Sequence, residues 1–277
     1  MLLSLLLAVA FADDPAYDHT AKPAEEVPKP TTALSAEFGG TFTSGNAFIL
    51  AFNGGINGKH DWGQNRFAFG TGVNLNLVKP DTNADGTLQP AEKAQKLTFT
   101  SQRITGAIRY DRFFGVKNSL YASAGIERDT FAGLEWRMNQ QLGYSRVLVK
   151  TEKSDLGLEA GLAYAEENLK EGDDGSNDKV LDNAFIAARV FLGFEHRFND
   201  KVAIGDTVET FFNLQQGEDI RLNNLAYITA KLSDRISLKL SHKLAFDNDP
   251  VVINEATNET YVPVDQTTQL TLVASIF

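Results

Sequence analysis

The stretch LEWRMNQQLGYSRVL, residues 134–148, has the pattern that decides the fold. Its apolar set is Leu134, Trp136, Met138, Leu142 and Tyr144, and its polar set is Glu135, Arg137, Asn139, Gln141 and Ser145. Successive side chains of a β-strand point to opposite faces, so this alternation predicts a strand with one apolar and one polar face. A helix would spread the charged residues over all of its sides.

The same alternation recurs from Ala33 onward and predicts an all-β chain with twelve strands. Their ranges are 33–43, 46–59, 64–79, 95–113, 118–128, 134–149, 154–165, 183–198, 201–215, 221–232, 235–246 and 266–277. In the fourth range the alternation changes phase around Arg103, which predicts a β-bulge or a bend.

The connections between these strands differ in length in a regular way. The second, fourth, sixth, eighth and tenth are short, whereas the long ones, 80–94, 166–182 and 247–265, are the third, seventh and eleventh. Transmembrane β-barrels have an even strand number, short periplasmic turns and long extracellular loops. The spacing therefore predicts a transmembrane antiparallel up-and-down β-barrel with both termini on the periplasmic side.

The polar faces of the predicted strands carry many charges, and we expect them to line the lumen. The candidate lumen-lining residues are Glu135, Arg137, Asn139, Gln141, Glu159, Arg189, Glu209, Lys239 and Lys243. A soluble β-barrel or β-sandwich would pack apolar side chains inside, and so many charges would be costly in a dry core. The polar faces favour the membrane barrel over this soluble alternative.

The N-terminal residues predict export. An apolar run from Leu2 to Ala10 is followed by Ala10-Phe11-Ala12, a small-x-small cleavage site, so we assign residues 1–12 to a signal peptide. The run is too short to span a bilayer as a helix. No Lys or Arg precedes it, which leaves open a start upstream of Met1. The proline-rich residues 13–32 predict a flexible periplasmic leader, and residues 33–277 the barrel.

Composition excludes some functions. The 277 residues include no cysteine, which removes disulfides and thiol chemistry, and the formal charge of −10 argues against a nucleic-acid partner. No other segment has the length and apolarity of a transmembrane helix.

Four segments resemble one known family. They are GGTFTSGNA at 39–47, IRYDRFF at 108–114, SLYASAGIERDTFAGLEWRMNQQLGYSRVL at 119–148 and SLKLSHKLAFDNDP at 237–250. On these segments the chain resembles the domain-of-unknown-function family of salt-induced outer-membrane proteins over roughly 34–277. The resemblance implies a barrel in the outer membrane, and it implies no ligand, cofactor or catalytic residue.

The segment DTNADGTLQPAE, residues 81–92, fits the calcium-loop pattern D-x-[DN]-x-[DN]-G-x5-E. Asp81, Asn83 and Asp85 would supply side-chain oxygens, Thr87 a backbone carbonyl and Glu92 a bidentate carboxylate. Pro90 and the flanking strands fit this pattern poorly, so a solvated turn is the alternative. No other cofactor is expected.

The segment 166–182 is strongly acidic, which is typical of a solvated loop and leaves a loose divalent-cation site as the alternative. Enzymatic activity is not expected. A hydrolase needs a histidine beside a nucleophile or carboxylate, and none of His19, His60, His196 and His242 has a Ser or Asp at strand spacing.

These observations predict a non-enzymatic barrel in the outer membrane of a Gram-negative-type bacterium, acting as a narrow, porin-like channel for small solutes or ions. The alternative is a structural, surface-stabilising barrel with a closed lumen and cation-binding loops, and an outer-membrane hydrolase is less favoured. The expected partners are outer-membrane lipid, lipopolysaccharide and the barrel assembly machinery, which would bind the strand ending at Phe277.

Overall fold

The computed structural model describes residues 30–44, 48–80, 89–129, 134–169, 181–248, 252–254, 259–260 and 263–276. The signal peptide, nearly all of the leader, Asp81, Asn83, Asp85, Thr87 and Phe277 lie outside these residues.

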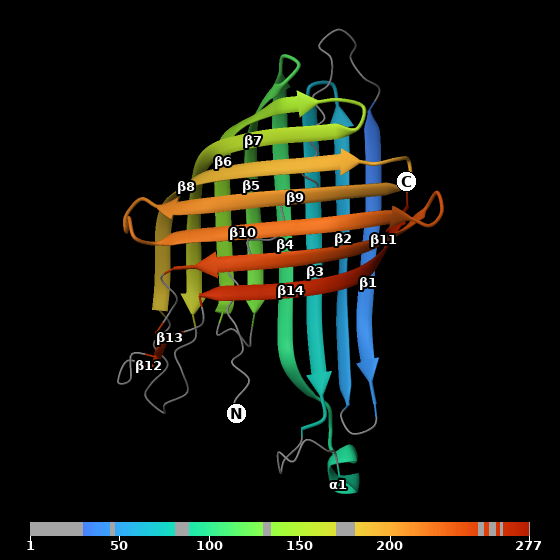
Figure 1. Ribbon diagram of the computed structural model, residues 1–277. Coiled ribbons are helices and arrows are strands. Elements are labelled where there is room, and N and C mark those ends of the chain that lie inside the picture. The colour runs from blue at the N-terminus through green and yellow to red at the C-terminus, as the bar shows by residue number, and fades with distance from the viewer. Residues whose placement is uncertain are drawn as a thin grey trace.

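Twelve antiparallel strands close into one barrel (Figure 1). They are β1 (Thr31–Thr43), β2 (Ile49–Trp62), β3 (Asn65–Val78), β4 (Thr98–Phe114), β5 (Asn118–Asp129), β6 (Leu134–Lys150), β7 (Ser154–Leu169), β8 (Leu181–Arg197), β9 (Val202–Asn213), β10 (Ile220–Lys231), β11 (Ile236–Asp247) and β14 (Val264–Ser275). Each strand pairs with its neighbour in the sequence, and β14 pairs with β1. The predicted fold, strand number and strand order are confirmed.

The alternation of short and long connections is also confirmed. The turn between β2 and β3 is residues 63–64, and the turn between β4 and β5 is residues 115–117. Gly63 and Gly115 have positive φ values of 53° and 68° in these turns, a conformation that glycine adopts without strain. At the opposite end, the long connections carry helix α1 (Pro90–Lys93) and the small sheet of β12 (Val252–Asn254) and β13 (Glu259–Thr260). Both lie at the lower end in Figure 1.

The predicted irregularity of the fourth strand is present, three residues before its expected place. Asn76 pairs with Ser101 and Leu77 with Phe99, so Thr100 is an extra residue in β4. Such a bulge changes the facing of the strand, which explains the change of phase in the sequence.

The outer surface of the barrel is apolar along its strands. Exposed side chains include Phe38, Ile108, Leu142, Leu162, Val190 and Leu240. None of the helices among the described residues is long and apolar enough to cross a bilayer.

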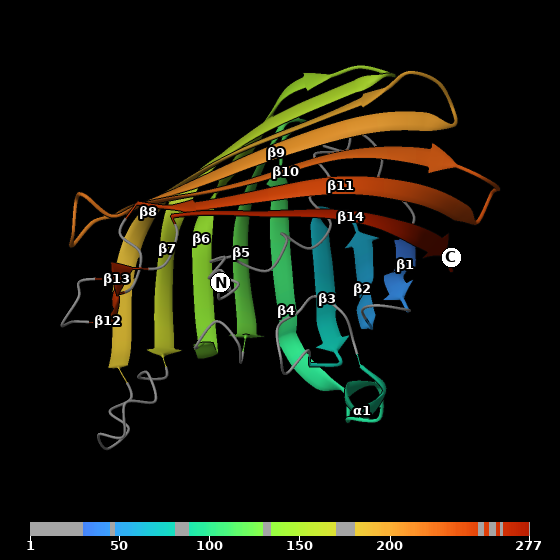
Figure 2. The same cartoon turned by 60° about the horizontal axis from the view of Figure 1, so that its bottom comes forward.

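The barrel is strongly sheared, as two views show (Figures 1 and 2). Strands β9, β10, β11 and β14 form a layer that crosses the layer of β1 to β6, and β7 and β8 bend from one layer into the other. Side chains on the inner faces of these two layers therefore approach one another across the interior.

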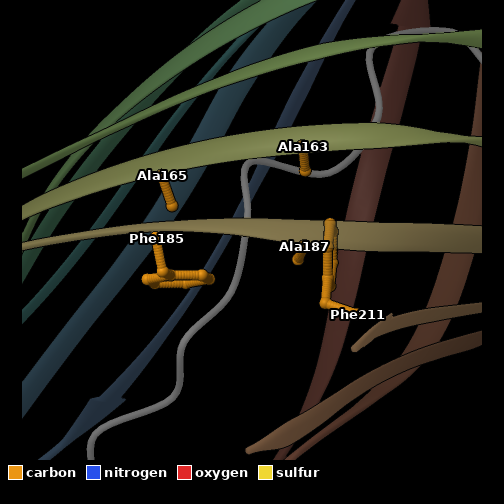
Figure 3. Packing of buried hydrophobic residues seen from close by; sticks show 5 residues of the cluster. All are labelled: Ala163, Ala165, Phe185, Ala187 and Phe211. Carbon is orange, nitrogen blue, oxygen red and sulfur yellow. The ribbon is translucent and has the colours of Figure 1, made fainter. Parts of the chain in front are cut away.

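One part of the interior is apolar, which the alternation did not predict. Ala163 and Ala165 of β7, Phe185 and Ala187 of β8 and Phe211 of β9 form a buried cluster (Figure 3). These residues take inward positions on their strands, so the interior contains a packed apolar layer in addition to its polar groups.

Candidate functional site

Two clusters of ion pairs fill the interior between β4 and β10. The first, the Glu159 cluster, consists of Arg109, Asp111, Glu159, Arg189 and Glu209. Glu159 Oε1 lies 2.6 Å from Arg109 Nη2, and its Oε2 lies 2.7 Å from Arg189 Nη1. Arg109 also binds Asp111 at 2.8 Å, and Arg189 binds Glu209 at 2.5 Å. The contact from β4 to β7 crosses two intervening strands, so it braces the barrel from inside.

Small residues on the inner faces of β5 to β7 make room for this crossing. The Tyr121 hydroxyl accepts a hydrogen bond from Arg189 Nη1 at 2.7 Å, and the Arg109 guanidinium lies 4.3 Å from the centre of the Tyr121 ring. Tyr121 reaches this position by lying over Gly143 and Gly161. A Cβ atom at Gly143 would come within 2.5 Å of the Tyr121 hydroxyl, and one at Gly161 within 2.9 Å. The two glycines therefore permit the Tyr121 bridge.

The second group, the Glu167 cluster, lies nearer the long loops and consists of Arg103, Glu127, Arg137, Glu167, Asp219 and Arg221. Glu167 Oε1 lies 2.8 Å from Arg137 Nε and 2.9 Å from Arg221 Nη1. Arg221 also stacks on Phe185 at 4.5 Å, which joins the cluster to the apolar layer. Buried ion pairs of this kind need several partners, because each charge has lost its hydration.

The inward residues of β1, β2, β3, β11 and β14 form a different kind of surface, which we call the polar wall. It contains Glu37, Asn53, Asn57, Asn74, Lys239, Ser241 and Gln269, all of intermediate exposure. The side chains of Glu37 and Lys239 form an ion pair at 3.1 Å and keep 23% and 21% of their surface accessible, whereas Glu159 and Arg189 keep none. Inward side chains face the lumen, so the lumen is more accessible beside the polar wall than beside the two clusters.

Most of the predicted lumen residues lie on the inner side of the barrel, either buried in or near the two clusters or part-exposed in or beside the polar wall. Arg137, Asn139, Gln141, Glu159 and Arg189 are buried, Glu209 is part-buried in the Glu159 cluster, and Lys239 belongs to the polar wall. Lys243 is half-buried on the same face of β11 as Lys239.

Glu135 departs from its predicted place. The register of β6 shifts between Leu134 and Trp136, so the alternation is interrupted there. Glu135 binds Arg128, whose side chain is 57% exposed, at 3.4 Å, while Leu134 is buried. The prediction that Glu135 lines the lumen and Leu134 faces outward was wrong for this end of the strand.

Several residues of the clusters and their surroundings were not predicted from the sequence to line the lumen, namely Arg103, Arg109, Asp111, Tyr121, Glu127, Glu167, Asp219 and Arg221. Arg109 and Glu127 lie on polar faces of predicted strands, so the alternation could have found them. Glu167 was assigned to an acidic loop because β7 was predicted to end at residue 165, whereas it continues to Leu169.

Three histidine side chains lie within hydrogen-bonding distance of a hydroxyl group on a neighbouring strand. His196 Nδ1 lies 2.8 Å from Ser154 Oγ, His60 Nδ1 2.8 Å from Thr32 Oγ1, and His242 Nδ1 2.9 Å from Thr268 Oγ1. The His196 and Ser154 pair was missed in the sequence because the two strands pair antiparallel with no motif between them. A hydroxyl and an imidazole are only two of the three parts of a catalytic triad, so these pairs alone support no hydrolytic role.

Glu92 is the one candidate calcium ligand within the described residues. It lies in α1, and its Oε2 accepts a hydrogen bond from the Gln89 backbone N–H at 2.8 Å, so the carboxylate caps its own helix. Among the residues that the structure describes, no group of three or more His, Cys, Asp or Glu side chains is placed to hold a metal.

With this interior described, comparison with protein families gives one match. The model of the family described as "Protein of unknown function, DUF481" matches residues 36–276, which is nearly the whole barrel. The chain belongs to this family. No curated protein matches the sequence.

Several solved structures have a similar fold, and this DUF481 chain covers nearly the whole length of three of them. The translocator domain of the autotransporter NalP from Neisseria meningitidis is 14% identical, with a TM-score of 0.48 and coverage of 90% of this chain and 88% of that one. The NanC porin is 8% identical, with a TM-score of 0.48 and coverage of 88% and 100%. An outer membrane channel from Pseudomonas putida F1 is 10% identical, with a TM-score of 0.46 and coverage of 97% and 100%. At these levels no function is transferred from them.

Proposed function

We propose that this DUF481 chain is a non-enzymatic outer-membrane barrel that acts as a narrow passage for small solutes or ions, with its long loops outside the cell. The apolar outer surface supports the membrane location. Exposed apolar side chains on β1, β4, β6 and β11, such as Phe38 and Leu142 at 58% and 66%, would be unfavourable in water but not in lipid.

Aromatic residues at the short-turn end support the same location. His60 stacks on Trp62 at 5.4 Å, Trp62 lies 6.3 Å from Tyr110, and Phe114 lies 6.1 Å from Tyr144. Rings of aromatic residues mark the membrane–water interfaces of outer-membrane barrels. Because this end also carries the short turns, which face the periplasm in such barrels, we infer that it lies at the periplasmic interface.

The observation that carries the passage is the accessibility of the polar wall. Glu37 and Lys239 remain partly exposed although they point inward. The Glu159 cluster holds two cationic and three anionic side chains, and the Glu167 cluster holds three of each. This acidic balance favours cations over anions in the lumen.

A specific observation also favours the second candidate, a structural barrel with a closed lumen. The Glu159 and Glu167 clusters cross the interior and are almost fully buried. If the polar wall were similarly closed in the membrane, the barrel would conduct nothing and would serve to stabilise the surface.

Planar-bilayer recording of the refolded full chain tests the proposal. Single-channel conductance with a preference for cations is expected. In Lys239→Gln the lumen loses one positive charge. A unit charge at 4 Å contributes about 1 kcal/mol in water, so the permeability to a monovalent cation should rise up to about fivefold and that to a monovalent anion should fall by a similar factor, which raises the cation-to-anion permeability ratio. Arg128→Gln, on the outer side of the β5 end, is the matched control and should leave the ratio unchanged. A silent bilayer would support the closed structural barrel instead.

We further propose that residues 81–92 bind calcium, as their oxygen-rich pattern suggests. Calcium in the range of about 10⁻⁴ to 10⁻³ M is expected to raise the melting temperature, because a ligand that binds only the folded state stabilises it. Asp81→Ala with Asp85→Ala should abolish this rise, whereas Asp173→Ala with Asp174→Ala, in the other acidic loop, should not. If calcium raised the melting temperature of both double variants equally, its effect would be general screening of the charges in the acidic loops, and residues 81–92 would not form a calcium site.

A further inference from the structure

The barrel is closed by an unusually short seam between its first and last strands. Strand β1 pairs with β14 only from Ser35 to Phe38, opposite Ser275 to Leu272, and Leu34 O accepts a further bond from Ile276 N at 2.8 Å. On its other edge β1 pairs with β2 from Thr31 to Thr43. In both views β14 approaches β1 with its C-terminal end, and the two strands then run apart (Figures 1 and 2). The pairing of β1 with β14 therefore stops after Phe38 and Leu272. The two backbones are still close at Gly39, where a Cβ atom would come within 2.6 Å of Leu270 O, and residues 40–43 and 264–269 lie beyond this contact.

This seam lies within the apolar outer surface. Phe38 and Phe42 of β1 are 58% and 64% exposed, and Leu270 and Leu272 of β14 are 57% and 42% exposed. Lipid cannot hydrogen-bond backbone N–H and C=O groups, so a strand edge without a partner is unfavourable in a bilayer. The seam is thus the part of the wall where the barrel is least sealed against lipid.

Two side-chain contacts behind the seam hold the flanking strands together. Lys239 Nζ of β11 donates to both carboxylate oxygens of Glu37 of β1, at 3.1 and 3.3 Å, and so reaches across β14. Gln269 Nε2 of β14 donates to Asn74 Oδ1 of β3 at 3.0 Å and so reaches across β1 and β2. These contacts are part of the accessible polar wall, where water or a polar group can replace either partner at little cost.

The outer face beside the seam also carries polar side chains. Thr268 Oγ1 of β14 lies 2.9 Å from His242 Nδ1 of β11, and Gln266 is exposed two residues away on the same face. Polar groups therefore occur on both faces of β14, next to the large apolar side chains of β1. A molecule with a polar head and an apolar chain would find partners for both parts here.

We propose that the β1–β14 seam is a lateral opening through which a single-chain amphiphile passes between the lumen and the surrounding bilayer. Its charged head would replace one partner in the contact between Glu37 and Lys239, or in the contact between Asn74 and Gln269. Its acyl chain would lie against Phe38, Phe42 and Leu270. The inference rests on the membrane location and the accessible lumen proposed above, and it names a substrate class for that lumen.

Photo-crosslinking of the full chain tests the opening. The natural chain has no cysteine, so Thr41→Cys can carry a single benzophenone maleimide at an inward position in the part of β1 that pairs with β2 but not with β14. The control is Asn57→Cys, an inward position of β2 that pairs with Ser35 and Gly70 on its two sides. Both proteins are reconstituted in phosphatidylcholine vesicles containing lysophosphatidylcholine, irradiated and analysed by mass spectrometry.

A lysophosphatidylcholine adduct severalfold more abundant at position 41 than at position 57 is the expected result. In a Glu37→Gln background the excess should increase, because the contact with Lys239 is weakened. Equal yields at both positions, or no lipid adduct at 41, would overturn the proposal. A crosslink from position 41 to a second copy, or to another segment of the same chain, would also overturn it, because the seam would then be covered by protein. Conductance without adducts would leave the proposed passage standing and remove only the lateral opening.

Discussion

Glu159→Gln is expected to lower the free energy of unfolding by about 3–5 kcal/mol, the range for removing one member of a buried ion pair. Glu159 has no accessible surface, and its carboxylate lies 2.6 Å from Arg109 and 2.7 Å from Arg189. Glutamine keeps the shape but removes the charge, so two guanidinium groups remain buried with less compensation. Urea titration of the refolded barrel in vesicles, followed by tryptophan fluorescence, measures the loss.

The matched control is Glu135→Gln. This side chain is 28% exposed and binds Arg128 at 3.4 Å, so its loss should cost no more than about 1 kcal/mol, as for other surface pairs. Adding Arg189→Gln to Glu159→Gln should cost less than the sum of the two single changes, because the residues share one network. Similar costs for the Glu159 and Glu135 variants would contradict a bracing role for the Glu159 cluster.

The alternation of apolar and polar residues was enough to predict the strands and their number. It reports only which side of a strand a residue lies on. Arg109, Glu159 and Arg189 lie on the predicted polar faces, but their contact joins β4, β7 and β8 across the interior. Which inward residues meet depends on the shear of the closed barrel, and periodicity carries no information on shear.

Local irregularities set a second limit on the prediction. A bulge adds one residue to a strand and reverses the facing of all residues beyond it. At the start of β6 this exchanged the expected places of Leu134 and Glu135. The short β1–β14 seam could not be predicted from the sequence either. Both strands alternate normally, and the length over which they pair follows from how the barrel closes.

Ile56→Arg is expected to impair assembly into vesicles. Ile56 lies in the middle of β2, is 46% exposed and points away from the interior. An arginine on the lipid-facing side costs about 2–4 kcal/mol near the membrane midplane. The folded fraction after refolding into phosphatidylcholine vesicles, measured by the shifted gel mobility of the unheated barrel, should fall clearly below that of the natural chain.

The neighbouring substitution Asn57→Arg separates the two faces of the same strand. Asn57 is half-buried and belongs to the polar wall, where the side chain can remain in contact with lumen water. We expect this variant to fold like the natural chain and to reduce the cation preference of any conductance, since it adds a positive charge to the lumen. Normal folding of Ile56→Arg together with failure of Asn57→Arg would mean that the apolar face does not contact lipid, and the membrane location would fall with it.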